Sequence, residues 1–215
     1  KQNEGLKSHE KFGLQLIGAA IFVVLFLLSG NAPLIYLPIF GEVNSIILFA
    51  LFTIIWIAGF SNAVNLTDGL DGLAASTNII AYGIYGIMAY RSAQHSIAIF
   101  CFCVVGGLLG FLVYNWKPAK VFMGDVGSLA LGAGLAIISI TLHKEWTLLL
   151  VGIIFVGETL SVILQVGSFK LTGKRIFKMS PIHHHFEMSG WKEVKIVSVF
   201  SAIGLIAGLI VAFVF

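Results

Sequence analysis

Three aspartates and a run of three histidines are the residues of this chain best suited to phosphate or metal chemistry. The aspartates are the only ones among 215 residues, and the histidines are half of the six that the chain contains. These residues are Asp68, Asp71, Asp125, His183, His184 and His185. Carboxylates bind hard cations such as Mg²⁺, and imidazoles suit polyanions such as a diphosphate. Together they indicate chemistry on a phosphate-bearing substrate.

The first acidic segment combines two carboxylates with two glycines. It reads Asn62-Ala-Val-Asn65-Leu-Thr-Asp68-Gly-Leu-Asp71-Gly. Asp68 and Asp71 are three residues apart, so they share a face if a helix begins here, and glycine lets the backbone approach a ligand closely. Such a pair suits Mg²⁺, which takes one or two carboxylates together with phosphate oxygens. Helix capping by Asn and Asp is the alternative, and it explains one aspartate better than the whole array.

The second acidic segment places Asp125 between glycines, just before an apolar run. It reads Asn115-Trp-Lys-Pro-Ala-Lys-Val-Phe122-Met-Gly-Asp125-Val-Gly. Backbone N–H groups at a helix start in this segment could meet phosphate. Phe122 has two explanations, because it could stack on a base, whereas an aromatic residue at a membrane interface is ordinarily an anchor. The residues alone favour the anchor.

The histidine segment is rich in cationic and imidazole groups. It reads Lys174-Arg-Ile-Phe-Lys178-Met-Ser-Pro-Ile-His183-His-His-Phe-Glu187, a composition suited to a diphosphate. A zinc site is the alternative, but adjacent histidines in a helix or strand point in different directions. No cysteine lies in the segment to complete such a site. We therefore favour anion binding.

Glu158 and Gln165 are polar residues inside an apolar run. An acid within a membrane span indicates function by default. However, Thr159 or Ser161 could hydrogen-bond to Glu158 locally, so the residues leave its role open.

The composition excludes an ordinary soluble domain. Hydrophobic residues make up 58% of the chain and charged residues 11%, whereas soluble domains carry about a quarter charged residues. The net charge of +3 does not indicate a nucleic-acid partner, because the basic residues lie between apolar runs and form no continuous basic face. Cys101 and Cys103 lie inside one such run and are expected to be packing residues.

Seven apolar runs meet or approach the roughly 17 to 25 residues that cross a bilayer. They are Phe12–Gly30, Asn44–Asn62, Leu73–Tyr90, Ser96–Tyr114, Gly127–Leu142, Thr147–Gly167 and Val194–Phe215. The runs are apolar on all sides, unlike the alternating strands of membrane barrels. We therefore predict an all-α, polytopic transmembrane helical bundle of about seven spans. The fifth run is short and rich in Gly and Ala, so it is expected to pack inside the bundle.

The basic residues are distributed unevenly between the two sides of such a bundle. Ten of the 13 lysines and arginines fall in the N-terminal arm and in the loops near 63–72, 115–126 and 168–193, and an eleventh, Lys195, lies at the boundary of the last loop. Only Arg91 and Lys144 fall on the other side. The positive-inside rule places the first set in the cytoplasm, and the aspartates and the histidine run lie on this same side.

Three stretches together resemble the polyprenyl-phosphate N-acetylhexosamine-1-phosphate transferase superfamily. They are NAVNLTDGLDGLA at 62–74, FMGDVGSLALG at 122–132 and PIHHHFE at 181–187. Any one Asp-Gly motif is weak, but three matching loops in order are specific, and the resemblance covers essentially all 215 residues. The histidine stretch favours the muramoyl-pentapeptide branch over relatives that use UDP-GlcNAc.

The resemblance implies a reaction and its partners. Undecaprenyl phosphate would attack the β-phosphate of UDP-MurNAc-pentapeptide, giving a lipid diphosphate sugar and UMP for peptidoglycan synthesis. Mg²⁺ would be the cofactor. The protein would lie in the bacterial plasma membrane with its active site facing the cytoplasm, and a homodimer is compatible with this picture.

The resemblance also implies roles for individual residues. Asp125 would lie closest to Mg²⁺, with Asp68 as a second ligand. Asn65, Asp68 and Asp71 would form a polar wall, and Phe122 would stack on uracil. The histidines His183, His184 and His185 would contact the diphosphate or the sugar. Further positions of the nucleoside pocket would be Leu66, Gly69, Asn115 and Gln165.

One feature of the family pattern is missing from this chain. Family members have about ten spans and an Asp-Asp-x-x-Lys motif at a cytoplasmic span end, but no two aspartates are adjacent here. We therefore expect residues 1–215 to form a single membrane-embedded transferase domain that lacks about three N-terminal spans.

Three alternatives remain. A sister transferase that uses UDP-GlcNAc would share the site. A cation-coupled transporter would instead have its site near the bilayer midplane. A structural membrane subunit would leave the histidine run unexplained.

Overall fold

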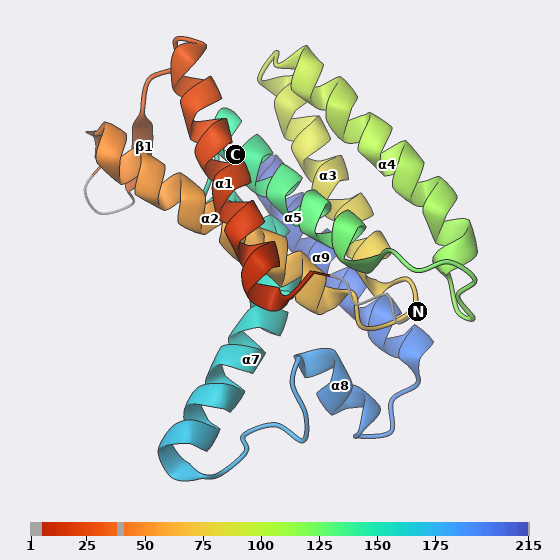
Figure 1. The fold of residues 1–215 in the computed structure, drawn as a ribbon. Coiled ribbons are helices and arrows are strands. Elements are labelled where there is room, and N and C mark those ends of the chain that lie inside the picture. The colour runs from red at the N-terminus through yellow and green to blue at the C-terminus, as the bar shows by residue number, and fades with distance from the viewer. Residues whose placement is uncertain (1–5, 38–40, 215) are drawn as a thin grey trace.

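The computed structural model describes residues 6–37 and 41–214. The chain folds as a bundle of long helices with one small hairpin (Figure 1). The elements are α1 (Ser8–Leu28), β1 (Leu34–Leu37), β2 (Gly41–Asn44), α2 (Ile46–Thr67), α3 (Leu73–Arg91), α4 (His95–Asn115), α5 (Gly124–Thr141), α6 (Thr147–Val151), α7 (Ile153–Thr172), α8 (Ile182–Glu187) and α9 (Glu193–Val214).

The predicted class, an all-α polytopic membrane bundle, is confirmed. Within the described part of the chain, six helices are long and apolar enough to cross a membrane: α1, α2, α4, α5, α7 and α9. These helices leave many large apolar side chains exposed. Because lipid tails cover such side chains in a bilayer, the exposure is expected here and needs no protein partner.

The predicted span Leu73–Tyr90, the third along the chain, is also a helix, but it is more polar than the other six predicted spans. It corresponds to α3, which packs mainly against α4 and α9. Twelve of its 19 residues are buried, including Thr77 and Asn78. The hydroxyl of Thr77 and the amide of Asn78 hydrogen-bond to backbone carbonyls one turn earlier. Protein, more than lipid, therefore surrounds this helix.

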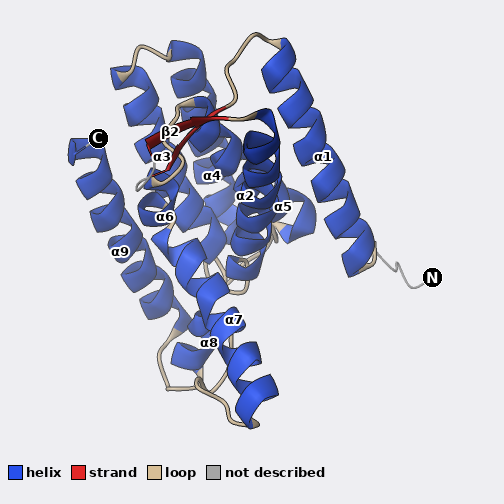
Figure 2. Cartoon of the chain, turned by 90° about the vertical axis from the view of Figure 1, so that its left-hand side faces the viewer, coloured by secondary structure: helices blue, strands red, loops and turns tan. Residues whose placement is uncertain are grey.

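The predicted span Thr147–Gly167 is wrong as a single helix. The structure divides it into the short α6 and the long α7, with a break at Gly152, and α7 continues to Thr172. Glycine has a low helix propensity and no side chain to hold the turn. At Gly152 an added Cβ would lie 2.8 Å from the carbonyl oxygen of Leu148. Beyond the break, α7 leaves the bundle together with α8 (Figures 1 and 2).

The connection between α1 and α2 contains structure that the sequence did not predict. Strands β1 and β2 pair antiparallel, with Leu34 opposite Asn44 and Tyr36 opposite Glu42. Figure 2 shows this hairpin near one end of the bundle, whereas α7 and α8 lie toward the other.

The short Gly/Ala-rich helix α5 packs closely on α2, as its composition predicts. A Cβ added at Gly132 would lie 2.7 Å from the carbonyl carbon of Phe60 and 2.7 Å from the Cα of Ser61. The hydroxyl of Ser61 also donates a hydrogen bond to the carbonyl of Leu129, at 2.7 Å. Because α2 and α5 approach through backbone atoms, a side chain at position 132 has no room.

We expect Gly132→Ala to lower the free energy of unfolding by about 2 kcal/mol, a typical cost of overpacking. Gly106→Ala in α4 is the matched control, because nothing lies within 4 Å of its added Cβ. Thermal unfolding of both detergent-solubilised variants measures the difference. Equal stability of the two variants would contradict the close approach of α2 and α5.

Candidate active site

A cavity of about 380 Å³ brings the two acidic segments together. It lies where α2 and α4 end and where α3 and α5 begin. Its walls are Asn65, Asp68, Gly69, Leu70, Asp71, Asn115, Phe122, Gly124 and Asp125. All three aspartates of the chain therefore face one polar space at one end of the bundle.

Asp125 lies in the first turn of α5, and its side chain is 46% exposed. Asn65 on α2 orients it by donating a hydrogen bond to Oδ1 at 3.0 Å, and the same amide nitrogen lies 2.9 Å from the hydroxyl of Ser128. Lys11 on α1 forms an ion pair with Oδ2 of Asp125. The carboxylate is thus fixed by two neighbouring helices while it remains open to the cavity.

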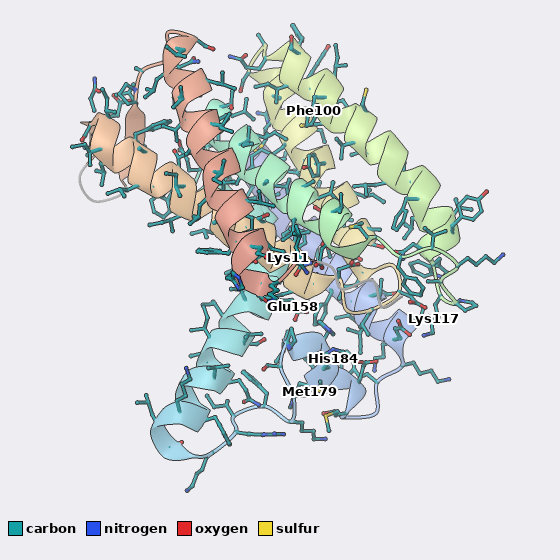
Figure 3. The ribbon with its side chains drawn as sticks, viewed as in Figure 1. Lys11, Phe100, Lys117, Glu158, Met179 and His184 are labelled. Carbon is teal, nitrogen blue, oxygen red and sulfur yellow. The ribbon has the colours of Figure 1, made fainter. Side chains whose placement is uncertain are left out.

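Lys11 is a site residue that sequence reasoning missed. It lies in the first turn of α1 (Figure 3), within ion-pair distance of Asp125. Its ammonium group occupies a position beside Asp125 that a metal cation would also favour. A lone lysine in the N-terminal arm reads as part of the positive-inside bias, so the sequence offered no signal that distinguishes it from Lys7.

Asp68 caps the C-terminus of α2 and is partly buried. The pKa of its carboxyl group is raised to about 6, mainly by burial; a hydrogen bond from the Gly124 backbone lowers the pKa, and the negative charge of Asp125 raises it. Two carboxylates that repel each other across one cavity are a suitable setting for a divalent cation.

Asp71 belongs to a different network on the wall of the same cavity. Its carboxylate accepts a hydrogen bond from the Ala119 backbone at 3.0 Å and lies 3.4 Å from Nζ of Lys117. Its backbone N–H donates to Glu193 at 2.7 Å, and Glu193 also pairs with Lys117. Glu193 first, and then Asp71, raise the pKa of Lys117.

Asp68 and Asp71 would share a helix face only if a helix began at the first acidic segment, and that condition is not met. Helix α2 ends at Thr67 and α3 begins at Leu73, so a turn carries both carboxylates. Asp68 consequently faces Asp125, and Asp71 faces Lys117. Gly72 has a φ of 80°, which glycine adopts readily and which lets the chain reverse between the two helices.

Asn115 and Phe122 also line the cavity. The side-chain oxygen of Asn115 accepts a hydrogen bond from the Gly72 backbone at 3.1 Å, and its nitrogen donates to the carbonyl of Val121 at 2.8 Å. Asn115 thereby ties the two acidic segments together. The ring of Phe122 is 73% exposed at the rim of the cavity, where a planar base could reach it.

Two of the residues expected to line the nucleoside pocket lie elsewhere. Leu66 is half-buried and is not part of the cavity wall, on which Leu70 lies instead. Gln165 bonds to the segment that follows α7, through the backbone of Ile176 and Phe177 at 2.9–3.0 Å. It lines a separate cavity of about 450 Å³ that also contains Lys170, Arg175 and Lys178.

The three histidines of α8 have different partners, although the rings of His183 and His184 pack with their centroids 4.1 Å apart. His183 is fully buried, His184 lies 2.5 Å from Glu187, and His185 accepts a hydrogen bond from the backbone of Lys178 at 3.1 Å. Within residues 6–37 and 41–214, no group of three His, Cys, Asp or Glu side chains could hold a metal ion.

His183 connects the histidine segment to the acidic cavity. Its ring packs against Gly69, where an added Cβ would lie 2.8 Å from Cε1 and closer still to Nε2. Gly69 is itself part of the cavity wall. The histidine segment therefore packs against the outer side of the cavity wall through His183, which is fully buried and does not line the cavity.

We expect Gly69→Ala to disturb the cavity without unfolding the bundle. The new methyl group must displace either the ring of His183 or the turn that carries Asp68. A transferase reaction should slow at least about tenfold, as for a misplaced catalytic group. The double variant Gly69→Ala/His183→Ala removes the clash, and turnover equal to that of His183→Ala alone is expected. Wild-type turnover of Gly69→Ala would contradict this packing.

Comparisons with known proteins bear on the family of the chain. The model of glycosyl transferase family 4 matches residues 4–143, which contain both acidic segments. This chain belongs to glycosyl transferase family 4. The resemblance drawn from the three stretches is thereby confirmed at the level of the family.

Curated relatives in this family are similar along nearly the whole chain. A phospho-N-acetylmuramoyl-pentapeptide-transferase of Lactiplantibacillus plantarum is 60% identical over 210 residues, 98% of this chain and 65% of that protein. The protein of the same name from Lacticaseibacillus paracasei is 54% identical over 213 residues, 99% of this chain and 66% of that protein. The chain thus spans slightly less than two thirds of the length of these relatives.

Proposed function

We propose that this chain forms the larger part of a transferase that moves phospho-N-acetylmuramoyl-pentapeptide from its UDP-linked precursor to undecaprenyl phosphate. The observation that carries the proposal is the single cavity in which the two acidic segments meet. The similarity to phospho-N-acetylmuramoyl-pentapeptide-transferases at 54% to 60% identity supports this choice of substrate.

The donor set of the cavity fits a magnesium ion. Asp68 and Asp125 supply the one or two carboxylates that Mg²⁺ usually takes from protein, and phosphate oxygens complete its shell. When bound, Mg²⁺ would neutralise negative charge on the diphosphate. Asn65 orients Asp125, and the ammonium group of Lys11 adds a positive charge next to the phosphates. The lipid phosphate is already an anion, so the residues mainly have to position the two substrates.

The layout also suits two substrates of different solubility. The cavity lies at the ends of helices, where a water-soluble nucleotide could enter, and a lipid phosphate could arrive from the bilayer. The excess of lysines and arginines on this side supports a cytoplasmic orientation in the bacterial plasma membrane. A transporter site would be expected near the midplane, between broken helices, whereas the acidic cavity lies at the ends of helices, which favours the transferase.

A substrate assay tests the function directly. Full-length protein in nanodiscs should release UMP from UDP-MurNAc-pentapeptide when undecaprenyl phosphate and Mg²⁺ are present. UDP-GlcNAc distinguishes the sister reaction. Release of UMP from UDP-GlcNAc but not from UDP-MurNAc-pentapeptide would favour the sister transferase. Release from neither nucleotide would contradict the proposed function.

His184→Ala should slow this reaction at least tenfold, which corresponds to about 1.4 kcal/mol in the barrier. The ring of His184 is 29% exposed and is held by Glu187, so its orientation is fixed while it remains accessible. Steady-state rates of UMP release measure the effect. Unchanged kinetics would assign His184 to the scaffold.

A further inference from the structure

Glu158 and His183 form a fully buried pair between α7 and α8. Oε2 of Glu158 lies 3.0 Å from Nδ1 of His183 and 3.4 Å from its backbone nitrogen. The side chains are 0% and 1% exposed. One carboxylate oxygen therefore meets both the ring and the first turn of α8, where backbone N–H groups lack partners within the helix.

The neighbouring hydroxyl groups on α7 do not hydrogen-bond to the carboxylate of Glu158. The hydroxyl of Ser161 donates to the backbone carbonyl of Glu158, and the hydroxyl of Thr159 donates to that of Phe155. Neither serves the Glu158 carboxylate, and Oε1 has no hydrogen-bond partner within the described part of the chain. A buried carboxylate is costly unless it is paired, so its presence in a membrane helix calls for a role.

The other edge of the His183 ring points toward the acidic cavity. Neither ring nitrogen has a hydrogen-bond partner among the described residues, so Nδ1 contacts Glu158 at ion-pair distance without forming a hydrogen bond. Nε2 is the ring atom that an added Cβ at Gly69 would meet first. Gly69 follows Asp68 directly in the turn. A line of contacts thus runs from Glu158 through His183 to the backbone beside Asp68.

The pair also lies at a particular place in the fold. Figure 3 shows Glu158 close to the point where α7 leaves the bundle, with His184 on α8 beyond it. Since α8 has only six residues, it is too short to be stable alone and depends on contacts with its neighbours. Glu158 supplies such a contact from the membrane helix.

We propose that Glu158 is a positioning residue, which holds His183 against Gly69 and so fixes the turn that carries Asp68. Glu158 itself does not reach the cavity. Its effect on catalysis rests on the proposed transferase function, whereas its effect on the geometry of the turn does not.

Hydrogen–deuterium exchange in the full-length protein, without nucleotide, tests the geometric part. Glu158→Gln should speed amide exchange at least fivefold in segments 62–72 and 181–187. Glu145→Gln is the matched control, because Glu145 is also a buried carboxylate, 2% exposed, but follows the opposite end of α5. It should leave both segments unchanged. Unaltered exchange at 62–72 in Glu158→Gln would overturn the proposal.

A second variant keeps the test decisive if Glu158→Gln does not fold. His183→Asn retains a donor near Glu158 but removes the ring edge that faces Gly69. Exchange should then increase at 62–72 and remain near wild type at 181–187. Unchanged exchange at 62–72 would overturn the proposal here as well.

Turnover provides the catalytic part of the test. Glu158→Gln should reduce kcat for UMP release at least tenfold, but less than twofold further when His183 is already alanine. Independent losses that multiply would mean that Glu158 does not act through His183. If the wild-type protein releases no UMP, the proposed function fails, while the exchange measurements still decide the role of Glu158.

Discussion

Asp125→Asn should reduce Mg²⁺-dependent UMP release by about a thousandfold, equivalent to about 4 kcal/mol in the barrier. Asp125 is a half-exposed carboxylate on the cavity wall, and an amide cannot replace its negative charge toward a cation. The substitution is nearly isosteric, and its oxygen can still accept the hydrogen bond from Asn65. The bundle should therefore remain folded, and the loss should appear in turnover measured at saturating substrate.

The matched control for Asp125→Asn is Glu10→Gln. Glu10 is an exposed acid in the first turn of α1, one residue before Lys11, and its carboxylate caps the backbone of Lys7. Its removal should leave turnover within about twofold of wild type. Turnover of Asp125→Asn at the level of this control would remove Asp125 from the metal site.

The Mg²⁺ concentration that gives half-maximal turnover should rise as the pH falls below about 6. The raised pKa of Asp68 means that this carboxyl group is mostly ionised above pH 6 and increasingly protonated below it. Mg²⁺ binds the ionised form, so proton and metal compete, and the apparent affinity should fall by up to about tenfold for each pH unit. Mg²⁺ titrations of UMP release between pH 5 and 8 measure this.

Asp68→Asn provides the control for the competition. The variant should need more Mg²⁺ at every pH, and its Mg²⁺ requirement should vary less with pH below 6. A wild-type requirement that is constant from pH 5 to 8 would show that Asp68 is not a ligand.

The fold class could be predicted because the bilayer imposes simple rules. Long apolar runs must form helices, and the excess of lysines on one side predicts which ends share a face. This was sufficient to expect that Asp68, Asp71 and Asp125 lie at the same end of the bundle. The prediction that α5 packs inside also followed from composition, because Gly132 permits close approach of the α2 backbone.

Other features depend on contacts between distant residues and therefore left no local signal. The break at Gly152 lies within a run whose hydropathy is continuous, so hydropathy alone could not separate α6 from α7. The pairing of Lys11 with Asp125 and that of Glu158 with His183 join residues that are 114 and 25 positions apart. Gln165 was carried over to the nucleoside pocket from a family resemblance, and its hydrogen bonds connect it to residues 176 and 177.

The different roles of Asp68 and Asp71 in the first acidic segment also could not be predicted from their spacing alone. A helical register would have placed Asp68 and Asp71 side by side. The turn at 68–72 instead directs Asp71 toward Lys117 and leaves Asp68 opposite Asp125. Only the turn brings a carboxylate from the end of α2, Asp68, to the same cavity as a carboxylate from the start of α5, Asp125.

The position of a bound metal tests the central claim most directly. Mn²⁺ can substitute for Mg²⁺ and is located by its anomalous scattering in a crystal of the full-length protein with a uridine diphosphate sugar. We expect one strong peak in the acidic cavity, within about 2.5 Å of carboxylate oxygens of Asp125 and Asp68. A peak elsewhere, with these carboxylates unoccupied and the nucleotide bound away from Phe122, would contradict it.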